Sequence, residues 1–229
     1  MVALENLVWR GMASAPKAGT LASGFGVLDR ELPGGGWPCG ALTELLGGLE
    51  GIGELQLVLP ALAALTAQGK RVAWLAPPHL PYAPALAAAG IDLTHLVVVR
   101  APGRRDGLWA AEQVLRAGSC HALLAWLQAP RYPELRRLAV AAGLGRACVF
   151  LFRSPAAAAE PSPAALRLAL ETAPEGLAVR ILKRRAATAA APVMLPFRNP
   201  FHALGLTPLL RPAFRDAGSA RRLGLPVHA

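Results

Sequence analysis

The residues best placed to do chemistry follow an apolar run at residues 41–46. A phosphate-binding loop needs a glycine-rich turn whose backbone N–H groups face the phosphates, a Lys that neutralises their charge, and a Ser or Thr that binds magnesium. Here Gly48 and Gly53 frame the turn, but Glu54 occupies the position of the Lys and Leu55 that of the hydroxyl. A carboxylate about 4 Å from a phosphate is repelled by about 1 to 4 kcal/mol. We therefore predict no bound nucleotide, and the glycines allow a tight turn from strand to helix.

Other reactive side chains do not form a recognisable catalytic or metal site. The five histidines are scattered, and no two have the i, i+4 or short-loop spacing of zinc ligands. Cys120 and His121 are adjacent on an expected strand, where neighbouring side chains point to opposite faces, so they would not form a nucleophile–base pair. Asp29 and Glu31 fall in a surface-like turn. We predict a protein without enzymatic activity, metal or cofactor.

The elements that must position the glycine loop alternate between short apolar runs and helix-like segments. This alternation favours an α/β fold with a mainly parallel, twisted sheet flanked by helices. Strands are predicted at residues 41–46, 71–76, 96–100, 122–127 and 147–152, and helices at 55–68, 84–89, 107–117 and 133–142. After a loop at 153–163, alternating apolar residues at 166–170 and 177–181 predict a C-terminal antiparallel hairpin.

Length and composition suggest one core with two terminal extensions. The chain has 229 residues, of which 54% are apolar. We predict an N-terminal helix or arm at 1–19, a core at 20–188 that lacks a functional phosphate-binding loop, and an extended tail at 189–229. No apolar run reaches the roughly 18 residues of a membrane span, and the first residues do not resemble a signal peptide. Cys39, Cys120 and Cys148 are far apart and predict no disulfide framework, so we expect a reducing, cytoplasmic location.

Positive charge is concentrated in the second half of the chain. Residues 1–99 hold five basic and seven acidic side chains, whereas residues 100–229 hold 19 basic and seven acidic ones. Such a field attracts nucleic acid, although 21 Arg against three Lys also fits a GC-rich genome. The candidate DNA contacts are in loops and helices that follow strands, and on the last predicted strand: Arg104, Arg105, Arg131, Arg136, Arg137, Arg153, Arg180, Lys183, Arg184 and Arg185. For residues 180–185 the alternative is a charged edge that resists strand pairing.

Apolar residues near both ends suggest contacts with protein partners. The candidates are Leu7, Trp9, Phe197, Phe201, Leu206 and Leu209. A terminal segment that packs back on its own core is the alternative to docking on another protein.

Residues 20–29 and 32–47 resemble, in order and spacing, the segment that leads into the nucleotide-binding loop of RecA-type recombinases. The resemblance continues to about residue 185 and implies a RecA-like core. In that family an activating Glu follows the second core strand and a magnesium-binding Asp ends a later one. Here the first position holds Pro77 and Pro78, and the second holds Trp126 and Leu127. Together with Glu54, these replacements imply a core that does not hydrolyse ATP.

Residues 8–11, 32–40 and 51–60 resemble ImuA, the RecA-like family of bacterial mutagenesis cassettes. This resemblance implies a non-catalytic accessory factor in SOS-induced, error-prone translesion DNA synthesis, located in the cytoplasm at the nucleoid. The implied partners are ImuB, RecA, DNA through the basic half, and indirectly an error-prone polymerase. Two alternatives stay open. One is a SulA-type inhibitor of cell division that acts on the GTPase FtsZ, and the other is a RecA-like ATPase with residual nucleotide binding.

Overall fold

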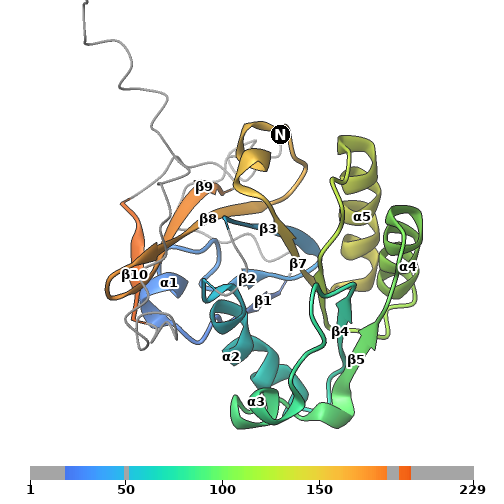
Figure 1. Cartoon of the computed structure of the whole chain (residues 1–229), viewed down its shortest axis with the longest axis horizontal. Helices are drawn as coiled ribbons and strands as arrows, with labels where there is room; N and C mark the ends of the chain where they lie inside the picture. The colour runs from blue at the N-terminus through green and yellow to red at the C-terminus, as the bar shows by residue number, and fades with distance from the viewer. Residues whose placement is uncertain (1–18, 49–51, 185–190, 197–229) are drawn as a thin grey trace, which may run out of the picture.

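An eight-stranded sheet forms the centre of the molecule (Figure 1). The computed structural model describes residues 19–48, 52–184 and 191–196. The strand order is β10-β9-β8-β3-β7-β6-β4-β5, and β1 and β2 form a separate antiparallel pair. From β8 to β5 neighbouring strands run parallel, whereas β8 with β9 and β9 with β10 are antiparallel. The expected α/β class, with a mainly parallel sheet and a C-terminal antiparallel hairpin, is confirmed.

The strands have the following bounds: β1 Thr20–Leu21, β2 Trp37–Pro38, β3 Ala41–Gly47, β4 Val72–Leu75, β5 Leu96–Val99, β6 Ala122–Ala125, β7 Cys148–Arg153, β8 Leu166–Ala173, β9 Gly176–Lys183 and β10 Val193–Leu195. The α-helices are α1 Gly26–Asp29, α2 Glu54–Thr66, α3 Ala83–Ala88, α4 Arg104–Arg116 and α5 Tyr132–Gly145. Two 3-10 helices complete the described elements, η2 Leu93–His95 and η3 Pro155–Ala159. No helix within these ranges is long and apolar enough to cross a membrane.

Helices cover the two faces of the sheet and divide its core in two. On one face, α1, α2 and α3 pack on apolar side chains such as Trp74 and Phe150. On the other face, α4 and α5 pack on Leu75, Leu123 and Val149, and Figure 1 shows these two helices side by side. Strands covered on both faces are apolar at every position, which explains why β4, β6 and most of β7 are continuous apolar runs.

Three of the differences between the structure and the sequence-based expectation lie in α4, in the loop after β7 and in the predicted tail. Helix α4 begins at Arg104, three residues before the predicted start, because Gly103 serves as its N-cap. The loop predicted at 153–163 contains η3. Within the predicted tail, β10 pairs with residues 177–179 of β9. These three tail residues therefore belong to the sheet, because an apolar segment there completes the edge beside β9.

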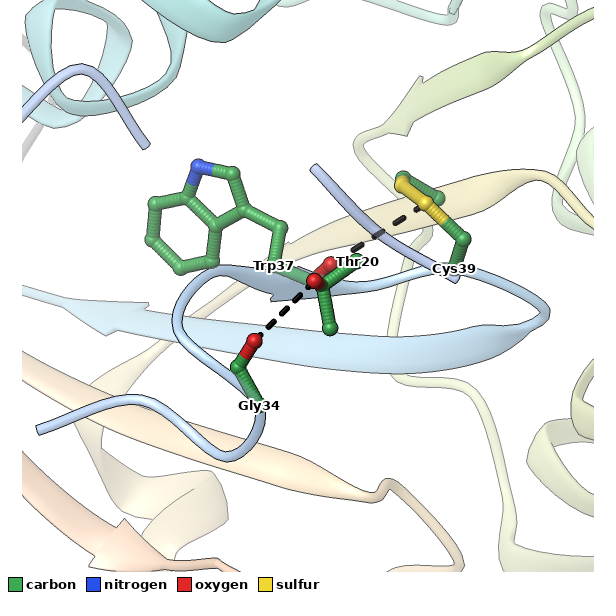
Figure 2. The surroundings of a disulfide bond; sticks show 5 residues. Thr20, Gly34, Trp37 and Cys39 are labelled. Carbon is green, nitrogen blue, oxygen red and sulfur yellow. Dashed lines mark hydrogen bonds between the residues drawn. A yellow bond between two sulfur atoms is a disulfide. The ribbon is translucent and has the colours of Figure 1, made fainter. Parts of the chain in front are cut away.

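Cys39 and Cys148 are joined by a disulfide, whereas the sequence predicted no cysteine pairing (Figure 2). The two residues are 109 positions apart, but their Cα atoms lie 4.2 Å from each other. The parallel pairing of β3 with β7 brings them together, because Ala41 faces Cys148 in the register and Cys39 lies just before β3. Sequence spacing could not reveal the pair, since only the strand order makes these residues neighbours.

Candidate functional site

The turn at the position of a phosphate-binding loop connects β3 to α2. Gly53 has a φ of +102° and precedes the first residue of the helix, so a residue with a Cβ would be strained there. Ile52, directly before Gly53, is buried in the core. A Cβ on Gly47, at the strand end of the turn, would lie 2.9 Å from the Cδ1 of Ile52. Leu55 also packs against this core. Apolar packing therefore fixes the described part of this turn.

Glu54 occupies the first turn of α2. The positive end of a helix dipole attracts an anion, and in a phosphate-binding loop that anion is the phosphate. In this chain the carboxylate of Glu54 supplies a negative charge at the same helix end. The replacement of Lys by Glu thus suits the stability of α2 and opposes phosphate binding.

A cavity of about 650 Å³ lies over the carboxyl ends of β3, β6 and β7. Glu54, Trp126 and Phe152 are among its lining residues. The rings of Trp126 and Phe152 are stacked, with centroids 4.4 Å apart and planes at 6°, and Trp74 approaches Trp126 at 5.8 Å. At the position where the RecA-type resemblance places a magnesium-binding Asp, the structure therefore has an aromatic stack.

A second cavity, of about 670 Å³, lies beside the ends of β4, β5 and β6. Pro77 and Pro78, at the position of the activating Glu of RecA-type proteins, line it together with Arg100 and Arg104. Neither proline has a side chain that could activate a water molecule. Among the described residues no group of three or more His, Cys, Asp or Glu side chains could hold a metal ion.

A buried cluster of charges under η3 was missed by the sequence reasoning. Glu44 of β3 has a fully buried side chain and accepts hydrogen bonds from Arg153 at 2.9 Å, Arg167 at 2.6 Å and the Ser162 hydroxyl at 2.8 Å. Arg167 also donates to the carbonyl oxygens of residues 157, 158 and 160. The cluster therefore ties the loop after β7 to β3 and β8. The signal in the sequence was a single charged residue, Glu44, inside a strand that is otherwise uncharged and mostly apolar.

Arg153 is removed from the candidate DNA contacts by this cluster. Its side chain is only 5% exposed and pairs with both Glu44 and Glu160, the latter at 2.6 Å. A guanidinium that already bonds two carboxylates and is shielded from solvent is not available to a phosphate. The sequence placed Arg153 in an open loop, but the loop folds back over β3 and β8.

Arg104 and Arg131 are brought together at the first turns of α4 and α5. The Glu134 carboxylate bonds the Arg104 guanidinium and accepts from the backbone N–H of Arg131 at 2.7 Å. Arg104 also donates to the Gln128 carbonyl oxygen at 3.2 Å. Arg104 is therefore partly committed to joining the two helices.

Arg105, Arg136 and Arg137 are exposed on the same two helices. Arg137 lies 3.8 Å from Glu112, and its side chain remains 63% exposed. These three arginines and Arg131, which is exposed at the N-cap of α5, are the more accessible candidates for an external ligand in this part of the molecule.

The basic residues of the last long strand form a separate group. Lys183 donates to the Ser162 carbonyl oxygen at 2.8 Å, and Arg184 donates to the Glu31 carbonyl oxygen at 2.9 Å. Arg180 is half-buried on β9. Figure 1 shows β9 and the α4–α5 pair on opposite sides of the molecule, so the predicted basic residues do not form one continuous site. Arg185 lies outside the described residues.

The partner-binding candidates Leu7, Trp9, Phe197, Phe201, Leu206 and Leu209 all lie outside the described residues. Their assignment remains a prediction.

Cys120 does not present a reactive thiol next to His121. Its side chain is buried in the core beneath α4 and α5, and this burial raises the pKa of the thiol. His121 is exposed. The two side chains therefore point into different environments, as expected for neighbours that lead into a strand.

The fold and the turn after β3 together define a class of protein. It is an α/β protein with a mainly parallel sheet. At the strand-to-helix turn after β3, Glu54 and Leu55 stand in place of the Lys and the hydroxyl of a phosphate-binding loop. At the ends of β6 and β7, a stacked aromatic pair stands in place of a magnesium-binding Asp.

Comparison with known proteins shows similarity to the cell division inhibitor SulA and to a RecA protein. The family model "Cell division inhibitor SulA" matches residues 41–149, which run from the start of β3 to the start of β7. Cell division inhibitor SulA of Edwardsiella piscicida is 31% identical over 109 residues, 46% of this chain and 65% of that protein. Protein RecA of a Picosynechococcus species is 30% identical over 109 residues, 48% of this chain and 31% of that protein. The chain thus matches only part of the length of either relative.

A solved structure of SulA from Pseudomonas aeruginosa is similar with 24% identity and a TM-score of 0.42. The match covers 49% of this chain and 97% of that one. Strands β8, β9 and β10 lie outside the segment that the SulA family model matches.

Proposed function

We propose that this chain is a non-enzymatic protein of the SOS response that inhibits cell division by binding the division GTPase FtsZ. The match of residues 41–149 to the family of division inhibitors carries the proposal. Of the alternatives that the sequence left open, this one agrees better with the comparisons than a role in translesion synthesis does. A cytoplasmic location follows from the same proposal.

The residues at the carboxyl ends of the parallel strands support action by binding rather than by catalysis. Glu54 at the start of α2, the Trp126–Phe152 stack and the Pro77–Pro78 pair replace three groups that an ATPase of this architecture needs. A domain that has this sheet but lacks these groups would act through the surfaces with which it binds other molecules.

The direct test is the GTPase rate and sedimentation of purified FtsZ with increasing amounts of the full chain. Inhibition that saturates near an equimolar ratio, with loss of sedimented polymer, is the expected result. The matched control is the same titration with ATP or ADP added, which should change nothing. An unchanged GTPase rate at a large excess of the chain would exclude FtsZ as the target.

The second candidate is a scaffold in translesion DNA synthesis that binds ImuB, contacts RecA and DNA, and reaches an error-prone polymerase through ImuB. One observation favours it: β8, β9 and β10 extend the sheet beyond the segment similar to SulA. A division inhibitor of the matched length would not need them. In this case the RecA-like core, nucleoid association and the tail contacts predicted from the sequence would also apply.

Pull-down of ImuB tests this second candidate and also separates it from the first. A truncation that ends after Pro196 keeps β10 in the sheet and removes the predicted tail contacts. Loss of ImuB binding with an intact far-UV spectrum would support the tail assignment, and undiminished binding would overturn it. A chain that captures ImuB and leaves FtsZ unaffected would establish the second candidate over the first.

A further inference from the structure

Three large apolar side chains are more than half exposed on the two helices that cover one face of the sheet. Trp109 of α4 is 66% exposed, and Val140 and Leu144 of α5 are 60% and 72% exposed. The opposite sides of both helices pack against the sheet, where Leu108, Leu115, Leu138 and their neighbours are buried. Clustered apolar side chains of this size on a surface mark a contact site more often than isolated ones do.

The exposed residues follow helical spacing. Arg136, Val140 and Leu144 are separated by four residues each and therefore form one stripe along α5. On α4, Arg105 and Trp109 have the same spacing. We call these five residues together with Arg137 the α4–α5 outer face.

Contacts between the helices set how α4 and α5 lie against each other before any ligand arrives. The Arg104–Glu134 and Arg137–Glu112 ion pairs join α4 to α5. Near the C-terminal ends the helices come so close that a Cβ on Gly145 would lie 2.3 Å from the Leu115 carbonyl oxygen. Figure 1 shows the two helices parallel and adjacent. A preformed surface of this kind costs little conformational entropy on binding.

The charge of the outer face is positive. Arg105, Arg136 and Arg137 are exposed there, and Arg116, the last residue of α4, is 58% exposed. Of the nearby carboxylates, Glu112 is 18% exposed and already paired with Arg116 and Arg137, and Glu134 is paired with Arg104. Asp106 is the remaining acidic side chain of α4.

We infer that the α4–α5 outer face docks an acidic segment of a partner protein that carries apolar side chains among its carboxylates. The carboxylates would pair with the arginines, and the apolar side chains would cover Trp109, Val140 and Leu144. Trp and Arg are the residue types that most often dominate binding energy at such contacts. Nucleic acid fits less well, because a phosphate backbone would satisfy the arginines and leave the aliphatic side chains in water. The inference concerns the chemistry of the partner and does not depend on FtsZ being that partner.

The probe is a fluorescein-labelled helical peptide with Leu on one face and Glu and Asp on the other. Its binding to the full chain is measured by fluorescence anisotropy. Leu144→Glu should weaken binding by roughly tenfold or more. The matched control is Leu80→Glu, because Leu80 is 73% exposed and lies outside the two helices; its effect should stay within about twofold. Both substitutions are on exposed side chains, and circular dichroism verifies the fold.

A second pair of variants tests the charge. Arg136→Glu should weaken peptide binding and Arg30→Glu, on the exposed end of α1, should not. Labelled duplex DNA serves as the competing macromolecule. The proposal is overturned if Leu144→Glu weakens peptide binding no more than Leu80→Glu, or if Leu144→Glu weakens DNA binding as much as peptide binding. Inhibition of FtsZ is measured independently of peptide binding. If the Leu144→Glu chain still inhibits FtsZ, this face does not bind FtsZ, and the proposed function stands.

Discussion

The molecule contains two clusters in which arginines meet a glutamate, and they differ in burial. Under η3, Glu44, Arg153 and Arg167 have side chains that are 0%, 5% and 8% exposed. Between α4 and α5, Glu112, Arg116 and Arg137 have side chains that are 18%, 58% and 63% exposed. The same residue types therefore organise the fold in the first cluster and remain available to a ligand in the second. Residue type alone does not separate a structural arginine from a binding one.

Removing one partner from the buried cluster should have the largest effect on stability. Arg167→Ala would remove one hydrogen-bond donor from the buried carboxylate of Glu44. It would also leave two carbonyl oxygens of η3 without the hydrogen bonds that Arg167 donates to them. We expect a loss of about 3 to 5 kcal/mol in the free energy of unfolding. Urea denaturation followed by circular dichroism measures it. A loss as small as that of Arg137→Ala would mean that solvent reaches the cluster.

Breaking the Cys39–Cys148 disulfide should have the next largest effect. It closes a long loop at the amino ends of β3 and β7, the same two strands that Glu44 and Arg153 join farther along. Cys39→Ser should lower the free energy of unfolding of the oxidised chain by about 2 to 4 kcal/mol. The control is the same comparison in dithiothreitol, where the wild type should lose most of its advantage. Equal stability of both chains under oxidising conditions would contradict the pairing.

A substitution that strains the turn after β3 should lower the free energy of unfolding by a smaller amount. Gly53→Ala places a Cβ at a φ of +102°, and we expect about 1 to 2 kcal/mol of destabilisation. Gly19→Ala is the control, because nothing lies within 4 Å of the added Cβ there. Thermal unfolding of both variants gives the comparison. A neutral Gly53→Ala would show that the turn has another accessible conformation.

The exposed cluster should give the smallest effect. Arg137→Ala is expected to change the free energy of unfolding by less than about 1 kcal/mol, because solvent screens both partners. The change should shrink further in high salt. Measuring unfolding at low and high ionic strength tests this. A large loss of unfolding free energy that does not depend on salt would mean that this cluster stabilises the fold, as the buried cluster does. That result would weaken the case for a binding face on α4 and α5.

Much of the fold could be predicted because its information is local. Apolar runs and helical spacing placed five strands, four helices and the hairpin within a few residues of their observed positions. The candidate site was less predictable. The sequence identified Glu54, Leu55, Trp126 and the Pro77–Pro78 pair as departures from a nucleotide site, but it grouped Arg153 with surface arginines. Leu144, the most exposed of the three apolar side chains on α4 and α5, fell outside the predicted helix, which ended at residue 142.

The sequence by itself determined where strands and helices follow one another along the chain. It also determined that the turn after β3 lacks the Lys and the hydroxyl of a phosphate-binding loop. Both results depend on residues that are neighbours in the chain. Only the tertiary structure decided that Cys39 meets Cys148, that Glu44 takes Arg153 and Arg167 as partners, and that Trp109, Val140 and Leu144 remain outside. The first two outcomes join residues more than 100 positions apart. The third depends on which side of each helix the sheet covers. The physical reason is that a side chain becomes buried only where two elements pack together, and the order of the strands within the sheet sets which elements pack together.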